Sequence, residues 1–169
     1  MGNGQRIDVE ITDRQVLVRD YGRGIPLRMV NACVSKMNTG AKYDSKVFKK
    51  AVGLNGVGSK AVNALSSSFS VQSVREGESK HSIFERGEIV TDGAVEPRNE
   101  KDGTIIIFTP DTELFGNYHF ISDYIEKMLW NYAYLNNGLT LNFNGEKIAA
   151  KNGLYDLLDN QIAGKICYP

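Results

Sequence analysis

The segment Gly53-Leu54-Asn55-Gly56-Val57-Gly58-Ser59-Lys60 is the most informative part of the sequence. Its three glycines leave backbone amides uncovered just before a helix that we expect to begin near Gly58. The segment is not a Walker loop, because Ser59 precedes Lys60 where that motif needs the reverse order. It also lacks the Rossmann glycine spacing, and no apolar strand precedes it. Uncovered amides at a helix N-terminus still form a site that suits a polyphosphate, although a flexible glycine-capped loop has the same pattern.

A second glycine group lies about 30 residues earlier, in the segment Asp20-Tyr21-Gly22-Arg23-Gly24-Ile25-Pro26. Apolar and polar residues alternate over 7–12, and an apolar run follows at 16–18, so two strands are expected here. Asp20 then stands at the end of the second strand, where it is followed by a glycine-rich turn. Alone, such a turn is a common surface feature. Its occurrence before the first segment, with a polar loop between the two, is much rarer.

Composition limits the class of protein without naming a function. The 169 residues are enough for one domain with a real core. Twenty basic and 20 acidic residues give a net charge of zero, so no overall basic field favours nucleic acid. Cys33 and Cys167 lie far apart, which argues against a disulfide framework or a zinc cluster and fits a reducing compartment. No apolar segment follows the N-terminus, and the longest uncharged stretch, 128–145, contains five asparagines, so neither a secretory signal nor a membrane helix is expected.

The remaining pattern predicts an α+β fold, a mixed sheet with helices packed on one face. Helices are expected over 27–37, from 58 onward, over 120–132 and over 154–158; hairpins over 69–84 and 139–149; and a central strand over 103–110. The helix that begins near residue 58 is expected to bury Ala61, Val62 and Leu65. Tyr124 and Met128 of the later helix are expected to belong to the core.

Five segments together resemble the ATPase domain of bacterial type IIA DNA topoisomerase B subunits, the gyrase B and topoisomerase IV B proteins. These segments are Asp20 to Pro26, Thr39 to Asp44, Gly53 to Gly58, Asn63 to Ser66, and Gly103-Thr104. The resemblance extends from about Ile7 to the C-terminus. It implies membership of the GHKL superfamily, with Hsp90, MutL and sensor histidine kinases, and a Bergerat fold that holds a nucleotide between sheet and helices under a lid.

The resemblance also implies roles for individual residues. Asp20 matches the aspartate that reads adenine, because a carboxylate only accepts hydrogen bonds and the adenine amino group donates one. The full set of matches is Asp20, Gly22, Gly24, Ile25 and Thr104 for adenine; Arg23, Pro26 and Arg75 for the rim, where coumarin-type inhibitors bind; and Lys42, Gly53, Leu54, Asn55, Gly56, Val57 and Gly58 for the phosphates. Thr104 could instead merely start a strand, Arg75 could be a solvated hairpin charge, and Lys42 is one of several lysines in its loop.

The sequence departs from the family pattern in two places. Tyr21 stands where many members carry a second acidic residue, which is expected to change the rim of the pocket. The family's N-terminal helix, with its water-activating glutamate and magnesium-binding asparagine, has no match in the sequence. Residues 1–169 are therefore expected to form a single GHKL ATPase domain truncated at its N-terminus. No catalytic or metal-binding residue is expected in it, and it should bind ATP and adenine-site ligands with little hydrolysis.

The family implies ATP and Mg²⁺ as cofactors, a second B subunit, the A subunit and DNA as partners of the intact enzyme, and a cytoplasmic location. In the intact enzymes of the family, ATP binding and hydrolysis drive DNA strand passage. The 169-residue chain itself is expected to be monomeric. The alternatives are another GHKL ATPase of the Hsp90 or MutL type and a non-enzymatic binding module. The sequence does not separate gyrase from topoisomerase IV.

Overall fold

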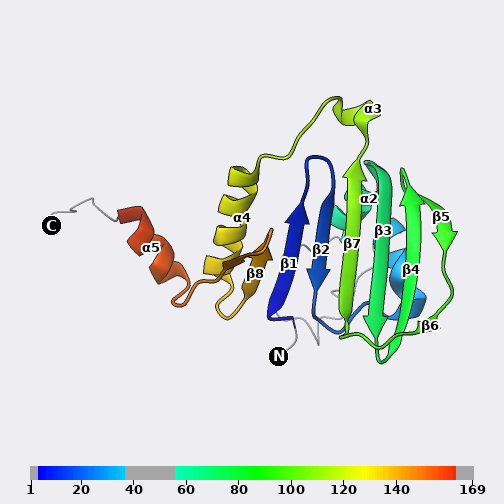
Figure 1. Cartoon of the computed structure of the whole chain (residues 1–169), viewed down its shortest axis with the longest axis horizontal. Coiled ribbons are helices and arrows are strands. Elements are labelled where there is room, and N and C mark those ends of the chain that lie inside the picture. The colour runs from blue at the N-terminus through cyan, green and yellow to red at the C-terminus, as the bar shows by residue number, and fades with distance from the viewer. Residues whose placement is uncertain (1–3, 37–55, 163–169) are drawn as a thin grey trace.

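The computed structural model describes residues 4–36 and 56–162. Within these residues, nine strands form one sheet in the order β5-β4-β3-β7-β2-β1-β8-β9, with β6 paired to β4 beside β5 (Figure 1). The strands are β1 (Arg6–Ile11), β2 (Val16–Asp20), β3 (Ser66–Arg75), β4 (Glu78–Glu85), β5 (Glu88–Asp92), β6 (Glu96–Pro97), β7 (Gly103–Pro110), β8 (Thr140–Phe143) and β9 (Glu146–Ile148). Only β1 and β8 pair in parallel among the described strands, so the sheet is mixed.

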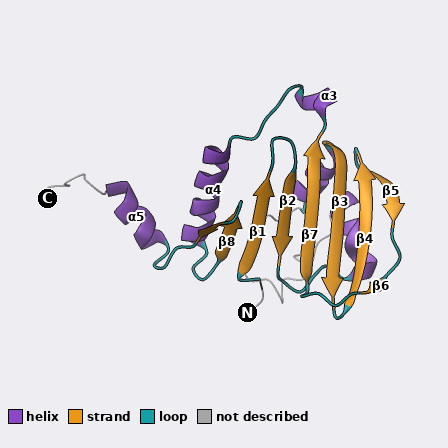
Figure 2. Cartoon of the chain, viewed as in Figure 1, coloured by secondary structure: helices purple, strands orange, loops and turns teal. Residues whose placement is uncertain are grey.

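The helices lie mainly on one face of the sheet and at one end of it (Figure 2). They are the 3₁₀ turn η1 (Leu27–Met29), α1 (Val30–Ser35), α2 (Gly58–Ala64), α3 (Thr112–Phe115), α4 (Ser122–Leu135) and α5 (Leu154–Ile162). Helices α1 and α2 lie behind the middle strands, α4 lies beside β8, and α5 projects away from the sheet (Figure 1). The predicted α+β class, a mixed sheet with helices on one face, is confirmed.

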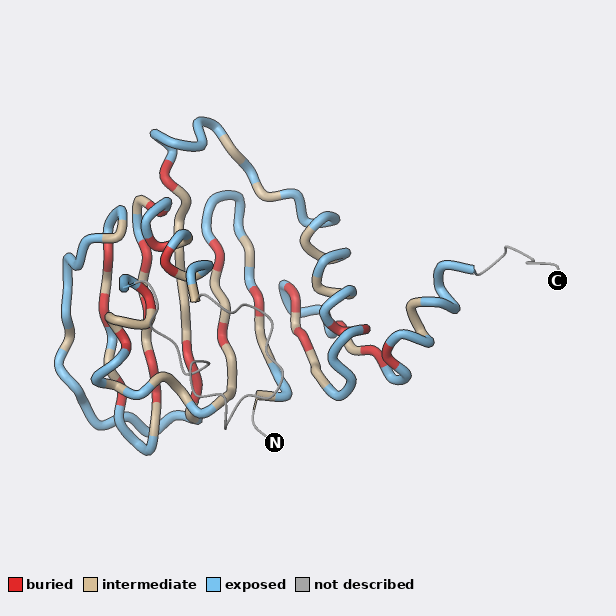
Figure 3. The backbone as a smooth tube through the Cα atoms, turned by 180° about the vertical axis from the view of Figure 1, so that it is seen from behind, coloured by how far each residue is buried: buried red, intermediate tan, exposed pale blue. Residues whose placement is uncertain are grey.

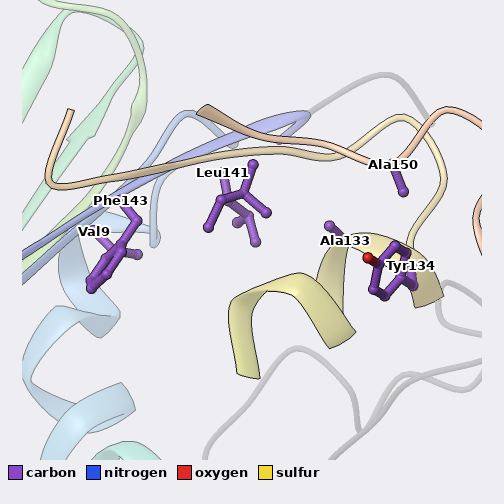
Figure 4. Close-up of a cluster of buried hydrophobic side chains, with 7 residues drawn as sticks. Val9, Ala133, Tyr134, Leu141, Phe143 and Ala150 are labelled. Atoms are coloured by element: carbon purple, nitrogen blue, oxygen red, sulfur yellow. The ribbon is translucent and has the colours of Figure 1, made fainter. Parts of the chain in front are cut away.

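Two apolar clusters form the core on the helix-covered face. The first joins α4 to β1 and β8; its members are Val9, Ala133, Tyr134, Leu141, Phe143, Ile148 and Ala150 (Figure 4). The second lies under α1; its members are Val30, Val34, Phe69, Val71 and Phe84. Buried positions accordingly concentrate on the central strands and on the helix segments that face them (Figure 3). Strand β2 runs between the clusters, since Val18 packs on the first and Ile106 of its neighbour β7 packs on the second.

Turn chemistry at the hairpins follows the sequence closely. Residues Asn144 and Gly145 both have positive φ, 48° and 90°, as the two-residue turn between β8 and β9 requires. Glu76 and Gly77 do the same between β3 and β4, with φ of 56° and 83°. The Asn144 side chain adds a tertiary tie, because its Oδ1 accepts a hydrogen bond from the Ile11 amide at 2.8 Å. This bond fixes the end of β1 against the β8–β9 hairpin.

One expectation about helix faces is wrong in part and another is wrong. Of the three residues expected to be buried in α2, Val62 packs on the second cluster, whereas Ala61 and Leu65 are exposed and the helix buries Lys60 and Asn63 instead. The reason is that α2 also packs against α1, where the Asn63 Nδ2 donates to the Val34 carbonyl at 3.0 Å. In α4, Tyr124 and Met128 are 68% and 57% exposed, because the helix packs on β8 through the neighbouring stripe that includes Ile125, Leu129 and Ala133.

Candidate functional site

Strand β2 presents Asp20 on the helix-covered face of the sheet. Alternate residues of a strand point to the same face, and Val16 and Val18 both belong to the covered side. Asp20 is half-buried at the last position of the strand. Its Oδ1 accepts a hydrogen bond from the Gly22 amide at 2.8 Å. The carboxylate therefore folds back over its own turn, with its remaining lone pairs free of any hydrogen bond from the described residues.

Strand β7 brings Thr104 next to Asp20. The antiparallel register pairs Arg19 with Ile105, so the following residue of β2 lies beside Thr104. The approach is so close at Gly103 that a Cβ there would overlap the Asp20 carbonyl oxygen, and Gly103 has φ +148°. A glycine is thus required at this crossing. Thr104 is only 8% exposed.

Strand β3 completes this group from the other side of β7. Ser73 pairs with Thr104 in the register and is fully buried. Its Oγ donates to the Ile25 carbonyl at 2.8 Å. Since Asp20, Thr104 and Ser73 occupy equivalent faces of three adjacent strands, a charged acceptor and two hydroxyls line one end of the covered face. Val18 and Ile106 form the apolar surface beside them, two residues farther along their strands.

The turn after Asp20 is attached to β3. Gly24 has φ +68°, and a Cβ on it would overlap the Val74 carbonyl oxygen, so the chain passes directly over the strand there. Ile25 packs against the second core cluster, whereas Arg23 and Pro26 are exposed at the margin of the turn. Arg75, one residue beyond Val74, is about one-third exposed and pairs with Glu76 through Nε and Oε1 at 3.1 Å. The residues assigned to the adenine group and to the rim therefore gather at one end of the sheet.

The second glycine group is described only in part. Lys42, Gly53, Leu54 and Asn55 lie outside the described residues. Gly56 has φ +56°, Val57 is the N-cap of α2, and a Cβ on Gly58 would meet open space. The side chain of the N-cap residue Val57 makes no capping hydrogen bond. Because Ser59 and Asn63 bond to carbonyls of α1, and α1 follows the Asp20–Pro26 turn, the two glycine groups lead into helices that pack together.

Several residues of this region were not identified from the sequence. Ser73, Val18 and Ile106 are among them, although alternation from Asp20 and Thr104 would have pointed to the last two. Tyr21 was expected to alter the pocket rim, and this is wrong. Its side chain lies on the opposite, uncovered face, where its hydroxyl donates to Asp8 Oδ2 at 2.7 Å.

The described residues give no support for a metal centre or a membrane segment. Over 4–36 and 56–162, no three His, Cys, Asp or Glu side chains converge as a metal site would require. Within the same ranges, no helix combines the length and the apolar character needed to cross a bilayer.

Comparison with known proteins defines the class. No protein-family model matches the chain. Among solved structures, the chain is similar to the 43K ATPase domain of Thermus thermophilus gyrase B in complex with an aminocoumarin, with a TM-score of 0.78 and 27% identity over 99% of this chain and 46% of that one. The fold is therefore that of the gyrase B ATPase domain, which is of the GHKL type.

Sequence relatives give the more particular assignment. The chain is 45% identical over 162 residues to the B subunit of DNA topoisomerase 4 from Borreliella burgdorferi, covering 96% of this chain and 27% of the relative. It is 33% identical over 156 residues to the B subunit of DNA gyrase from Campylobacter jejuni, covering 87% of this chain and 20% of that protein. The chain is homologous to the ATPase region of bacterial type IIA DNA topoisomerase B subunits. It spans about a quarter of the length of these curated relatives.

Proposed function

We propose that the chain binds ATP through the end of the sheet where Asp20, Thr104 and Ser73 meet. The observation that carries this proposal is the position of the Asp20 carboxylate on the covered face, at the end of β2, with one lone pair bound to the Gly22 amide. The adenine amino group donates a hydrogen bond to such an acceptor. Guanine presents a carbonyl oxygen at the same place, and two facing acceptors repel. A site of this kind can discriminate by about 10⁴-fold.

The other contacts of the nucleotide follow from the two glycine groups. Gly22, Gly24 and Ile25 would let the base approach the backbone, with Val18 and Ile106 as its apolar floor. Arg23, Pro26 and Arg75 would border the mouth, where coumarin-type inhibitors bind. The phosphates would lie on the backbone amides of Gly56, Val57 and Gly58. Lys42, Gly53, Leu54 and Asn55 complete that proposed group.

The function of the whole protein is proposed from its relatives. In the whole protein, ATP binding and hydrolysis would drive DNA strand passage. The protein would act in the cytoplasm with a second B subunit and the A subunit as partners and Mg²⁺ as a cofactor. Residues 1–169 would act as a single ATPase domain. A monomeric polypeptide of these 169 residues should bind adenine-site ligands and coumarin-type inhibitors.

The test of the proposal is the replacement Asp20→Asn, measured by titration calorimetry with ATP. The amide keeps one acceptor oxygen but replaces the other with a donor, so one charge-assisted hydrogen bond is lost. Such bonds contribute about 1.5–3 kcal/mol, and the dissociation constant should rise about 10- to 150-fold. Asp123→Asn, in the exposed first turn of α4, is the matched control and should bind as the parent does. Unchanged ATP affinity in Asp20→Asn would remove Asp20 from its proposed role.

A further inference from the structure

Tyr21 directly follows Asp20 and is held on the uncovered face of the sheet by three polar partners. Its hydroxyl donates to Asp8 Oδ2 at 2.7 Å. The guanidinium carbons of Arg6 and Arg19 lie 5.0 and 5.1 Å from the centroid of its ring. A guanidinium within about 6 Å of an aromatic ring is attracted by the ring quadrupole. The ring is thus fixed both at its edge and over its surface.

Asp8 is itself immobilised, which makes it a firm partner for Tyr21. Arg6 donates to both carboxylate oxygens, through Nε at 2.8 Å and Nη2 at 2.9 Å. Asn142 of β8 donates from Nδ2 to Oδ1 at 2.6 Å. These hydrogen bonds, that from Arg6 above all, lower the pKa of Asp8 to about 2. Asp8 therefore stays ionised over the physiological range and always accepts from the Tyr21 hydroxyl.

Arg19, on β2, is the third residue that contacts Tyr21. It is 9% exposed, and its Nη2 donates to the Lys101 carbonyl at 2.7 Å. Its Nη1 is buried and has no hydrogen-bond partner within the described structure. None of the ion pairs between described residues involves Arg19. Among the described residues, the Tyr21 ring is thus one of the few groups that stabilise this buried charge, and the two side chains hold one another.

We infer that Tyr21, anchored by Asp8, Arg6 and Arg19, is a positioning residue that fixes the Asp20 carboxylate from the opposite face of β2. The two residues share a peptide unit, so a ring that cannot move restricts the backbone rotation that would swing the carboxylate away from the base. A fixed acceptor costs less ordering free energy when a ligand binds. The inference rests on the proposed adenine site.

The experiment measures the affinity of two ligands by calorimetry, with Tyr21 replaced both in the parent protein and in the Asp20→Asn variant. The ligands are ATP and purine riboside 5′-triphosphate, which lacks the 6-amino group that Asp20 accepts from. Tyr21→Ala should weaken ATP binding about three- to tenfold, in the range of coupling between neighbouring residues, and change binding of the purine analogue less than about twofold. Tyr21→Phe, which loses only the hydroxyl, should show a smaller loss in the same direction. In an Asp20→Asn background, Tyr21→Ala should have no further effect on ATP affinity.

Each result supports or overturns the inference. Equal loss of both ligands in Tyr21→Ala would show that Tyr21 only supports the fold, and no loss of either would show that it does not position Asp20. If Tyr21→Ala does not fold, Tyr21→Phe and Asp8→Asn carry the same comparison, because both keep the ring. Tyr155→Ala, 68% exposed on α5, is the control and should leave both affinities unchanged. If the parent protein binds ATP and the analogue equally, the proposed adenine site fails, whatever the Tyr21 variants do.

Discussion

The ionised Asp8 carboxylate should stabilise the folded protein at neutral pH, and this contribution to the free energy of unfolding should be lost at acid pH. Its pKa lies at about 2 in the folded chain, against an ordinary value of 3.8, chiefly because of the hydrogen bonds from Arg6. A tenfold change in proton affinity corresponds to about 1.4 kcal/mol. Since the side chain is 17% exposed, partial screening by solvent leaves roughly 1–2 kcal/mol. A lowered folded-state pKa means that this stability is fully present above the unfolded-state pKa and is lost as pH falls through the folded-state pKa.

The assay is urea unfolding of the parent and Asp8→Asn at a series of pH values from about 7 to about 3. Near neutral pH the variant should be less stable by roughly 1–2 kcal/mol, which for a domain of this size lowers Tm by about 2–8 °C. By about pH 3 roughly half of that difference should have disappeared, because the unfolded chain takes up the proton first. Asp13→Asn, exposed in the turn between β1 and β2, should show a far smaller difference at neutral pH. A difference for Asp8→Asn that stays constant over the whole series would refute the linkage.

Two further predictions concern the second core cluster and the turn above it. Phe84 is fully buried and meets Phe69 edge-on with centroids 6.1 Å apart, so Phe84→Ala should cost about 3–5 kcal/mol in chemical denaturation. Phe115→Ala, at a side chain 48% exposed, should cost less than half as much, and equal costs would contradict the assigned core. Gly24→Ala should lower both Tm and ATP affinity, because its Cβ meets the Val74 carbonyl in addition to the strain of a positive φ. Gly116→Ala has a similar φ, +62°, in open space, so it should lower Tm less and leave ATP affinity alone.

The sequence predicted those features that depend on neighbouring residues. Alternation identified β1, continuous apolar runs identified β2 and β7, and Asn144-Gly145 identified a hairpin turn whose two residues indeed have positive φ. These signals are local, since a strand's side-chain period and a turn's backbone angles are properties of a few adjacent residues. The mixed sheet with helices on one face followed from them.

The helix faces could not be predicted in the same way. Helix α2 has seven residues, too few for an apolar stripe to define its orientation. Its burial depends on Asn63 reaching the Val34 carbonyl, 29 residues away in sequence. In α4, apolar residues lie on more than one side, and only the packing against β8 shows that the stripe with Ala133 is inside. Tertiary contacts thus overrode the local pattern in both helices. Strand β5 was missed because all five of its residues are exposed, so it carries no core signal.

The sequence predicted the residues of the candidate site that match the family motifs. It did not predict the residues that support them. Asp20 and Thr104 could be named because they match motifs, and the structure brings them to adjacent strands. Ser73 matches no motif, and only the pairing of β3 with β7 places it there. The grouping of Arg6, Asp8 and Tyr21 depends on side-chain geometry across two strands, which a single sequence does not contain.

Three sets of contacts restrain the turn that begins at Asp20. These restraints affect how well the proposed site can discriminate between bases. Gly103 blocks movement toward β7, Gly24 lies against β3, and Tyr21 anchors the opposite face. Discrimination between an amino group and a carbonyl oxygen requires an acceptor that cannot turn away, because a mobile carboxylate could relax to avoid the wrong base. The proposed base-reading half of the site is therefore built on rigid strands. In contrast, the described part of the proposed phosphate group, Gly56 to Gly58, lies at the start of the short helix α2. It follows that substitutions around Asp20 should alter which base is bound, whereas substitutions at Gly56 to Gly58 should alter affinity for triphosphates of every base alike.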